Sequence, residues 1–381
     1  METRKLYYED SLLRRFTATV LSCEKTDRGY EIILDATAFY PPGGGQACDT
    51  GFLNDAAVID VYERGEAVIH LCDRPLSGTV EGRIDWEGRL DRMQQHAGEH
   101  IVSGIICRRY GCHNVGFHMG ADVITIDFDA PIPVEALPEI EAEANAAVEA
   151  DLPIRGWYPD PETLKTIPYR SKKALDWPVR IVEIPGIDAC ACCGVHVPRT
   201  LQVGVVKLFS CVKFHQGVRI EMACGRRALG ILNAVYDQNR QVSQAFSAKI
   251  METGEAARKM NERLSAMEYR SAQLQKQVFA AIAEGYAGKE NVLHFGDLTP
   301  GEVRELAEAI LPQISGSALV CGGTEGKFSF CLASHTDGKA AGNALCTALN
   351  GRGGGKPPFF QGSLNATKAQ IEAYWQKAPL A

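Results

Sequence analysis

Hydrophobic and polar positions alternate in short runs along the first part of the chain. Between residues 8 and 84, runs such as 16–22 and 30–35 alternate with a period of two and are bounded by Gly, Pro and Asp residues. This alternation is typical of half-buried strands separated by turns. It predicts a small N-terminal β-barrel, to which we assign residues 1–88.

The period changes after Asp85, a residue type suited to the N-cap of a helix. Apolar residues then recur every three or four positions, which predicts an amphipathic helix; they are Trp86, Leu90, Met93, Ala97, Ile101 and Ile105. An Ala/Glu-rich helix is expected near residues 134–150, and strands are expected on both sides of it. Helices and strands mix unevenly, which favours an α+β core over residues 89–224 instead of a doubly wound parallel sheet.

The segment 226–284 contains no proline, and apolar residues follow a heptad seam between positions 246 and 281. One continuous helix of about 90 Å is predicted at about 1.5 Å per residue. Such a seam needs a partner helix, so we expect a homodimer through residues 246–281. We assign 225–287 to this coiled-coil segment and 288–381 to a compact C-terminal α/β domain.

The composition is that of an ordinary globular chain, with 381 residues, 45% hydrophobic and 23% charged. This length predicts several domains. No run approaches the roughly 18 apolar residues of a membrane span, and the first residues mix acids with bases without an apolar h-region. We therefore expect no membrane association and a cytoplasmic location. The 13 cysteines are better explained as reduced thiols or metal ligands than as a disulfide framework.

The formal charge of −7 argues against a uniformly basic nucleic-acid binder, but charge is unevenly distributed. Residues 121–162 carry eleven acids against one Arg, whereas 213–276 carry eleven bases against six acids and 341–381 carry four bases against one acid. The basic regions could face a polyanion. On charge alone, solvated helix faces explain them equally well.

Two histidines stand four residues apart on the predicted helix, which puts His96 and His100 on one face and within reach of one metal ion. Zinc normally takes four ligands, so a second pair must converge on the first. Two Cys-x3-His pairs exist, Cys192 with His196 and Cys211 with His215, and spacing does not choose between them. Clustering favours the first pair, because Cys190 and Cys193 are its neighbours.

The same histidines also match the His-x-x-Glu-His signature of one class of zinc peptidases, with Glu99 as the general base. That interpretation requires a distant carboxylate as third ligand and leaves the cysteine cluster without a purpose. A second alternative is that Glu99 is an ordinary solvated carboxylate of the helix.

A glycine-rich segment, residues 37–51, lies among the predicted strands of the N-terminal domain. Gly44 and Gly45 belong to a run of three glycines that lets the backbone approach a ligand closely, and Gln46 adds an amide that can donate or accept hydrogen bonds. The segment lacks the Lys-Ser/Thr of a Walker A loop. The alternative is a plain hairpin turn.

In this order, the motifs resemble the editing domain of alanyl-tRNA synthetases and its free-standing relatives, the AlaX proteins. The resemblance is carried by Phe-Tyr-Pro-Pro-Gly-Gly-Gly-Gln at 39–46, His-Ala-Gly-Glu-His at 96–100 and Cys-Cys-Gly-Val-His at 192–196. The run Gly-Arg-Gly-Gly-Gly-Lys-Pro-Pro at 351–358 is similar to the DHHA1 domain of the longer AlaX proteins. The implied fold is α+β, with a zinc-binding editing core and a DHHA1-like C-terminal domain.

The resemblance implies a trans-editing hydrolase, an aminoacyl-tRNA deacylase that cleaves Ser-tRNA(Ala), with Gly-tRNA(Ala) as a second substrate. It selects Cys192 and His196 as the partners of His96 and His100 in a Zn2+ site. It also implies that Thr37 contacts the serine hydroxyl and that the glycine-rich segment takes part in catalysis through Gly44, Gly45 and Gln46.

The implied partner is mischarged tRNA(Ala), and basic side chains are expected to contact its phosphates, which position the nucleic acid without reading bases; we assign this role to Arg219, Arg226, Arg227, Arg352 and Lys356. Two other functions remain as alternatives. One is the zinc metallopeptidase, and the other is a non-catalytic tRNA-binding protein in which zinc is only structural.

Overall fold

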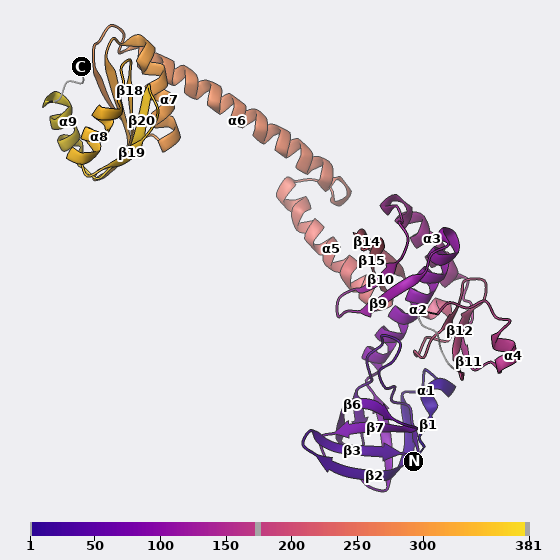
Figure 1. Ribbon diagram of the computed structural model, residues 1–381. Coiled ribbons are helices and arrows are strands. Elements are labelled where there is room, and N and C mark those ends of the chain that lie inside the picture. Colours follow the sequence, from indigo (N-terminus) through magenta and orange to yellow (C-terminus); the bar gives the residue numbers. More distant parts are fainter. Residues whose placement is uncertain (1, 172–176, 378–381) are drawn as a thin grey trace. The chain divides into compact units, whose positions relative to one another are not determined.

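The structure is a computed structural model that describes residues 2–171 and 177–377 (Figure 1). It divides into two compact units, Met1–Gln241 and Val242–Ala381. Each unit contains two clusters of buried hydrophobic side chains of its own.

Six antiparallel strands of the first unit close into a barrel in the order β2-β3-β7-β6-β5-β8. Along β2 the side chains of Phe16 and Ala18 point into the barrel and their neighbours are exposed, as the period of two requires. The parallel pair β1 (Arg4–Lys5) and β4 (Ala36–Thr37) and the short helix α1 (Leu6–Glu9) lie beside it. The barrel strands are β2 (Arg15–Thr26), β3 (Gly29–Leu34), β5 (Gly51–Leu53), β6 (Ala56–Arg64), β7 (Ala67–Cys72) and β8 (Thr79–Ile84).

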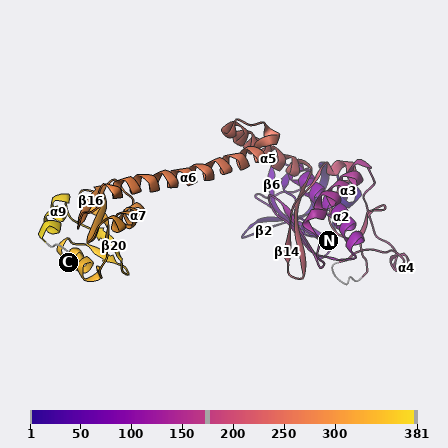
Figure 2. The same cartoon turned by 90° about the horizontal axis from the view of Figure 1, so that it is seen from above.

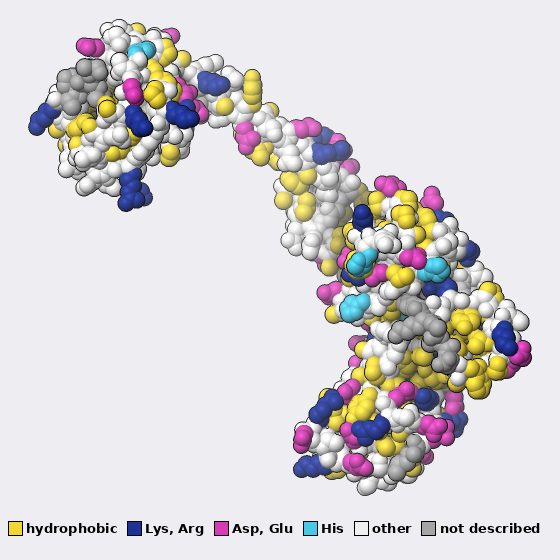
Figure 3. Space-filling view, viewed as in Figure 1, with side chains coloured by type: hydrophobic (Ala, Val, Ile, Leu, Met, Phe, Trp, Pro, Cys, Tyr) yellow, Lys and Arg dark blue, Asp and Glu magenta, His cyan; other side chains and the backbone are white. Residues whose placement is uncertain are grey.

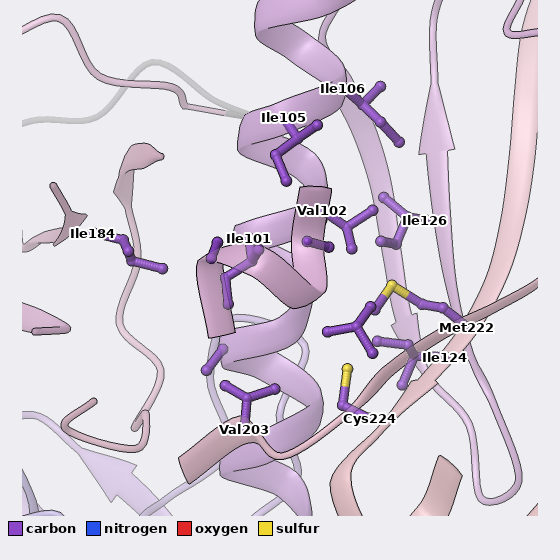
Figure 4. Close-up of a cluster of buried hydrophobic side chains, with 14 of the residues drawn as sticks. Ile101, Val102, Ile105, Ile106, Ile124, Ile126, Ile184, Val203, Met222 and Cys224 are labelled. Atoms are coloured by element: carbon purple, nitrogen blue, oxygen red, sulfur yellow. The ribbon is translucent and has the colours of Figure 1, made fainter. Parts of the chain in front are cut away.

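Helix α2 (Trp86–Tyr110) is the central element of the first unit, and residues 93–106 are all buried. Asp85 occupies the N-cap position as predicted, although its side chain accepts no capping hydrogen bond. At the other end Gly111 adopts the left-handed conformation, with φ 61°, which ends helices and suits glycine. Figure 4 shows Val102 and Ile106 of α2 on the side of Ile124, Ile126 and Met222 from the adjoining sheet, whereas Ile101 lies on the side of Ile184.

The sheet that packs against α2 has the order β14-β15-β10-β9 and is antiparallel throughout. Helix α3 contacts both α2 and β14, and a three-stranded sheet of order β11-β12-β13 contacts α2 through β13. The contact between β13 and α2 places the segment that contains Cys190, Cys192 and Cys193 close to the helix. The elements are β9 (Asn114–Met119), β10 (Ile124–Phe128), η1 (Val134–Ala136), α3 (Leu137–Glu149), β11 (Arg155–Trp157), α4 (Pro161–Leu164), β12 (Ile181–Ile184), β13 (Asp188–Ala191), η2 (Thr200–Val203), β14 (Val206–Phe214) and β15 (Gly217–Cys224).

The proline-free segment forms two helices, so the expectation of one continuous helix was wrong. Helix α5 spans Gly225–Phe246 and α6 spans Thr253–Glu284, with the short turn η3 (Ile250–Glu252) between them. Ser247 takes a positive φ of 50°, and the Ser243 hydroxyl donates to the Ala248 carbonyl at 2.6 Å. The heptad positions 253–281 therefore lie on α6, which Figure 2 shows as one uninterrupted helix, whereas 246 and 250 do not.

The second unit contains a five-stranded sheet of order β16-β17-β18-β20-β19, in which only β16 and β17 pair in parallel. Alternate residues of β17 point to opposite faces of the sheet. Val320 joins the cluster that holds α7 and the end of α6, and Leu319 joins the cluster that holds α8 and α9. The elements are β16 (Val292–Gly296), α7 (Pro300–Ile310), η4 (Leu311–Gln313), β17 (Ser317–Thr324), β18 (Lys327–Ser334), α8 (Lys339–Ala348), β19 (Arg352–Gly354), β20 (Phe359–Leu364) and α9 (Lys368–Lys377).

The predicted α+β class is confirmed by these separate sheets and helices. Within the described ranges, the helices that reach the length of a bilayer crossing are too polar to make one.

Candidate metal centre

Two segments nearly a hundred residues apart bring four potential metal ligands together. Helix α2 carries His96 and His100 one turn apart, and the segment after β13 carries Cys192 and His196. One donor atom from each of the four lies within 4.8 Å of the others. The Cys192 Sγ is 3.4 Å from His96 Nε2 and 3.9 Å from His196 Nε2.

These distances match what a tetrahedral zinc ion requires of its donors. With Zn–N bonds of about 2.0–2.1 Å and a Zn–S bond of about 2.3 Å, nitrogen and sulfur donors lie about 3.6 Å apart. Imidazole and thiolate are also donor types that zinc accepts. The four side chains could therefore hold a metal ion, and their burial shields it, because the three histidines are buried and Cys192 is half-buried.

Hydrogen bonds turn two of the imidazoles so that Nε2 faces the other ligands. The Nδ1–H of His96 donates to Gln46 Oε1 at 3.2 Å, and the Nδ1–H of His100 donates to Asp188 Oδ2 at 2.9 Å. Arg170 holds the Asp188 carboxylate through two bonds of 2.7 Å. Asp188 and Cys190 lie close enough to His100 to form a second potential ligand group. Because Arg170 and His100 already occupy both oxygens of Asp188, we interpret Asp188 as an orienting residue.

The hydrogen bond between Asp188 and His100 leads to a testable prediction about metal affinity. Asp188→Asn should lower the affinity of the site for zinc by about 10- to 100-fold, because carboxylate partners of ligating histidines fix the ring and raise its basicity. A competitive chelator titration measures the effect. Asp129→Asn is the matched control, since Asp129 accepts from His113 Nδ1 at the same 2.9 Å on an exposed surface. Equal affinities in the two variants would contradict the orienting role.

Electrostatics favour the thiolate that metal binding requires. Burial raises the pKa of the Cys192 thiol, but the imidazoles of His96 and His100 outweigh it and hold this pKa well below its usual value. Burial, supported by the charge of His96, lowers the pKa of His196 to about 3, so His196 is a neutral donor. A thiolate and a neutral imidazole are the forms in which these residues bind metals.

The glycine-rich segment lies directly against the ligands. Gly44, with φ 60°, would place a Cβ atom 3.3 Å from His96 Cε1, and Gly45, with φ 84°, would place one 2.7 Å from the Phe117 ring. On the other side, a Cβ atom on Gly194 would lie 2.1 Å from His96 Cε1. A side chain at position 44, 45 or 194 would therefore crowd the neighbouring ring, so the close approach of the glycine-rich segment and the segment around Gly194 to His96 and Phe117 requires glycine. A plain hairpin turn, the alternative considered above, would not need this approach to the ligands.

The structure does not bring Thr37 to the ligands. Thr37 is fully buried, and its hydroxyl lies 2.8 Å from His70 Nε2 and accepts from the Phe39 backbone N–H at 3.1 Å. Burial lowers the pKa of His70 to about 4, and its Nδ1–H donates to the Ile32 carbonyl at 3.1 Å. His70 is therefore neutral with Nε2 as an acceptor, and the Thr37 hydroxyl donates to it. Contact of Thr37 with a serine hydroxyl stays a prediction.

A cavity of about 600 Å³ opens beside the ligands. It is lined by the ligands His96, His100 and Cys192, by both positive-φ glycines and by Phe117, whose ring stacks on His96 with centroids 5.3 Å apart. Glu99 also lines the cavity. With 3% of its surface exposed, Glu99 is not the solvated helix carboxylate considered above.

The alternative pair Cys211 and His215 does not join the cluster. Cys211 lies on β14 with its thiol 3.5 Å from the Ile132 carbonyl, and His215 occupies the turn after that strand with φ 51°. Among the described residues, the group around His96 contains no carboxylate ligand, in contrast to what the peptidase interpretation requires.

The basic residues assigned to phosphate contacts differ in how exposed their side chains are and in how closely they pair with carboxylates. Arg219 forms two bonds of 2.7 and 2.8 Å with Asp127, and Arg227 is paired with Asp91. Arg226 of the first unit, and Arg352 and Lys356 of the second, are exposed or largely so.

Asp188, Arg170 and Phe117 contribute to the site, and sequence reasoning missed all three. For Asp188 a signal was available, because Asp188, Cys190 and Cys192 alternate with the period of a strand and so share one face. Arg170 and Phe117 lie far from the ligands in sequence, and no spacing relates them to the site.

Parts of this chain are similar to known proteins. The family described as the threonyl and alanyl tRNA synthetase second additional domain matches residues 179–221. An alanine–tRNA ligase of Thermofilum pendens is 31% identical over 392 residues, which cover 96% of this chain and 43% of that protein. The alanyl-tRNA editing protein Aarsd1 of Mus musculus is 26% identical over 397 residues, which cover 97% of this chain and 96% of that protein.

The chain thus spans less than half of the ligase and nearly all of the mouse protein. Among solved structures, the C-Ala domain from Aquifex aeolicus alanyl-tRNA synthetase matches 22% of this chain and 87% of that chain, at 20% identity and a TM-score of 0.20.

Proposed function

We propose that this chain, which belongs to the AlaX-type family of alanyl-tRNA editing proteins, hydrolyses the ester that joins a wrong amino acid to tRNA(Ala). Serine is the principal substrate residue and glycine the second. The reaction is that of an aminoacyl-tRNA deacylase, a carboxylic ester hydrolase, and we place the protein in the cytoplasm.

One observation carries this proposal: three imidazoles and a thiolate converge beside a cavity that two of the imidazoles, the thiolate and the glycine-rich segment line. Editing of this kind answers a physical need, because an alanine pocket cannot exclude the smaller glycine and rejects an added hydroxyl only poorly. A second, hydrolytic site must then remove the error. A cavity lined by backbone and by metal-binding side chains suits a small aminoacyl ester.

We propose Zn2+ as the metal, held by His96, His100, Cys192 and His196. A bound zinc ion supplies positive charge that polarises an ester carbonyl or a water molecule. The chain's own residues prepare the site, because Gln46 and Asp188 fix two imidazole rings. Gly44 and Gly45 let the backbone approach the substrate, and Thr37 is kept as the residue for recognising the serine hydroxyl.

Hydrolysis of charged tRNA tests the function. Purified protein should deacylate Ser-tRNA(Ala) and, more slowly, Gly-tRNA(Ala), and it should spare Ala-tRNA(Ala). A chelator should abolish the reaction and added zinc should restore it. Hydrolysis of casein without deacylation would support the peptidase, and tRNA binding without any hydrolysis would support a scaffold with structural zinc.

Phosphate contacts of the tRNA would come from exposed basic residues. We propose Arg226, Arg352 and Lys356 for direct contacts. Arg219 and Arg227 are paired with Asp127 and Asp91 and would reach phosphates only by exchanging those partners, whereas Arg226 makes only a longer, exposed contact of 3.8 Å with Glu87. Such contacts supply affinity that falls with salt and is independent of sequence.

We also propose a homodimer through the apolar seam of α6. This seam, whose large side chains are exposed, consists of Met260, Leu264, Met267, Leu274 and Val278, and Figure 3 shows hydrophobic side chains among charged ones along this helix. Burying each such side chain is worth about 1.5–3 kcal/mol. A second copy of the same helix provides a complementary stripe of matching length.

The seam can be tested by placing charges on it. Leu264→Glu combined with Met267→Glu should convert the dimer to a monomer, because the carboxylates would be buried without partners. Sedimentation velocity measures the change. Tyr269→Glu is the control, since Tyr269 is exposed on α6 outside the seam. A double variant that stays dimeric would place the interface elsewhere.

A further inference from the structure

Arg180 is a half-buried basic residue in the wall of the cavity beside the candidate metal centre. It directly precedes β12, and it lines the same cavity as the candidate ligands His96, His100 and Cys192. Among the described residues of this wall, it is the single arginine or lysine. Neither the proposed metal ligands nor the residues proposed for phosphate contacts include it.

Three contacts hold the guanidinium of Arg180 in place. Its Nη1 atom donates to the carbonyl oxygens of Cys192 and Gly194, each at 3.0 Å. Its Cζ atom lies 4.3 Å from the centroid of the Tyr8 ring, and the face of an aromatic ring attracts a cation at this distance. The charged group is therefore anchored to the backbone of a candidate metal ligand.

This anchoring leaves part of the guanidinium available to a ligand. An arginine has five N–H donors in a fixed planar fork, and within the described part of the chain Arg180 donates hydrogen bonds through Nη1 alone. Glu99, the carboxylate of the described wall, instead accepts from Ser103 and Asn114. A Cβ atom on Gly156 would lie 2.0 Å from Arg180 Nη2, so glycine at this position leaves room for that end of the fork. Nε and Nη2 can therefore donate to an anion.

The substrate that we propose brings an anion to this wall. The ester of an aminoacyl-tRNA is attached to the ribose of the last nucleotide, and the 5′ oxygen of the same ribose carries a phosphodiester. When the ester lies at the metal ligands, that phosphodiester must lie within the span of one nucleotide from them. The Arg180 guanidinium meets this requirement, because it is hydrogen-bonded to the backbone of Cys192.

We propose that Arg180 binds the phosphodiester on the 5′ side of the last nucleotide of the tRNA and so holds the ester at the metal centre. This inference rests on the proposed deacylase function. Arginine suits the role because its planar fork can bond two phosphate oxygens at once. Phosphate contacts position a nucleic acid without reading its bases, so Arg180 would be a substrate-binding residue that contributes affinity and orientation.

A pair of non-hydrolysable probes tests the contact separately from catalysis. The first is 3′-deoxy-3′-(L-serylamido)adenosine, and the second is the same compound with a methyl phosphate diester on its 5′ oxygen. Zinc-loaded wild-type protein should bind the second probe at least about tenfold more tightly, since it gains hydrogen bonds between charged groups. Arg180→Gln should remove this preference, so that both probes bind equally. Calorimetry measures the two affinities, and their ratio is the readout.

Two further variants keep the test interpretable. Arg180→Lys keeps the charge but loses the planar fork, and it should retain part of the preference. Arg83→Gln is the matched control and should retain all of it, because Arg83 also stacks on an aromatic ring, 5.0 Å from the Phe52 centroid, but lies on β8 outside the cavity. Zinc content is measured for every variant, so that a loss of metal is not mistaken for a loss of phosphate binding.

The outcomes separate this inference from the proposed function. Loss of the phosphate preference in Arg180→Gln, with a higher KM for Ser-tRNA(Ala), supports the inference. It is overturned if the wild-type protein shows no preference, if Arg180→Gln weakens both probes equally, or if inorganic phosphate displaces the second probe at a lower concentration than the probe itself requires. Wild-type protein without deacylase activity contradicts the proposed function instead, and the ratio of probe affinities still decides whether Arg180 binds phosphate.

Discussion

Replacement of Cys192 by alanine should remove zinc and deacylase activity together. Cys192 is the only thiolate in the ligand group, and its loss leaves three imidazoles to hold the ion. Loss of a partner that only orients a ligand already lowers metal affinity by about 10- to 100-fold, so loss of a ligand should lower it by more than about 100-fold. Elemental analysis after dialysis against a weak chelator measures the metal.

The control is Cys211→Ala, since Cys211 lies on β14 away from the cluster. That variant should retain about one zinc per chain and its full activity. If instead Cys211→Ala lost the metal and Cys192→Ala kept it, the ligand assignment would be reversed.

Replacement of Arg89 by alanine should lower the free energy of unfolding of the first unit by about 3–5 kcal/mol, because removing one partner of a buried ion pair leaves the other charge poorly compensated. Asp49 would keep only the longer contact of 3.2 Å with Arg92 as an ion pair. Arg89 and Asp49 are both fully buried. The Arg89 Nε lies 2.9 Å from both Asp49 oxygens, and its guanidinium also donates to the Ala38 carbonyl at 2.5 Å. Denaturant unfolding measures the change.

Arg74→Ala is the control for this effect. Arg74 pairs with Asp73 on the surface, where such pairs are worth at most about 1 kcal/mol. The double variant Arg89→Ala with Asp49→Asn should lose less than the sum of the two single variants, because it removes both charges of the fully buried pair and leaves only the partly exposed Arg92 without its carboxylate. Additive losses would show that the two residues stabilise the fold independently.

This ion pair also joins two parts of the site. Asp49 lies near the end of the glycine-rich segment and accepts from the Tyr40 backbone N–H at 2.7 Å, whereas Arg89 lies in the first turn of α2. Partial unfolding near the pair should therefore reduce metal affinity as well as stability.

Local periodicity predicted the elements on which the site depends. The helix after Asp85 was predicted because its apolar positions repeat at helical spacing, and that spacing also put His96 and His100 on one face. The pairing of Cys192 and His196 with them came from resemblance, because spacing alone left Cys211 and His215 equally suitable.

The features that sequence reasoning missed depend on tertiary packing. Nothing in the local sequence indicates that Arg170 binds Asp188, or that Glu99 is buried on a helix that is enclosed on all sides. The end of α5 was missed for a different reason. A serine with positive φ at 247 ends the helix, where glycine or proline would have been the expected signal.

The arrangement of the ligands along the chain sets an order of events during synthesis. His96 and His100 come into register as soon as α2 forms, but the two donors that follow β13 emerge from the ribosome almost a hundred residues later. Each pair alone offers an ion only two donors. A nascent chain therefore gains the full set of four candidate ligands only when β13 docks on α2, so capture of the proposed metal would report that the first unit has assembled. With the proposed metal, the protein would differ in this respect from small zinc domains, whose folding is driven by the metal.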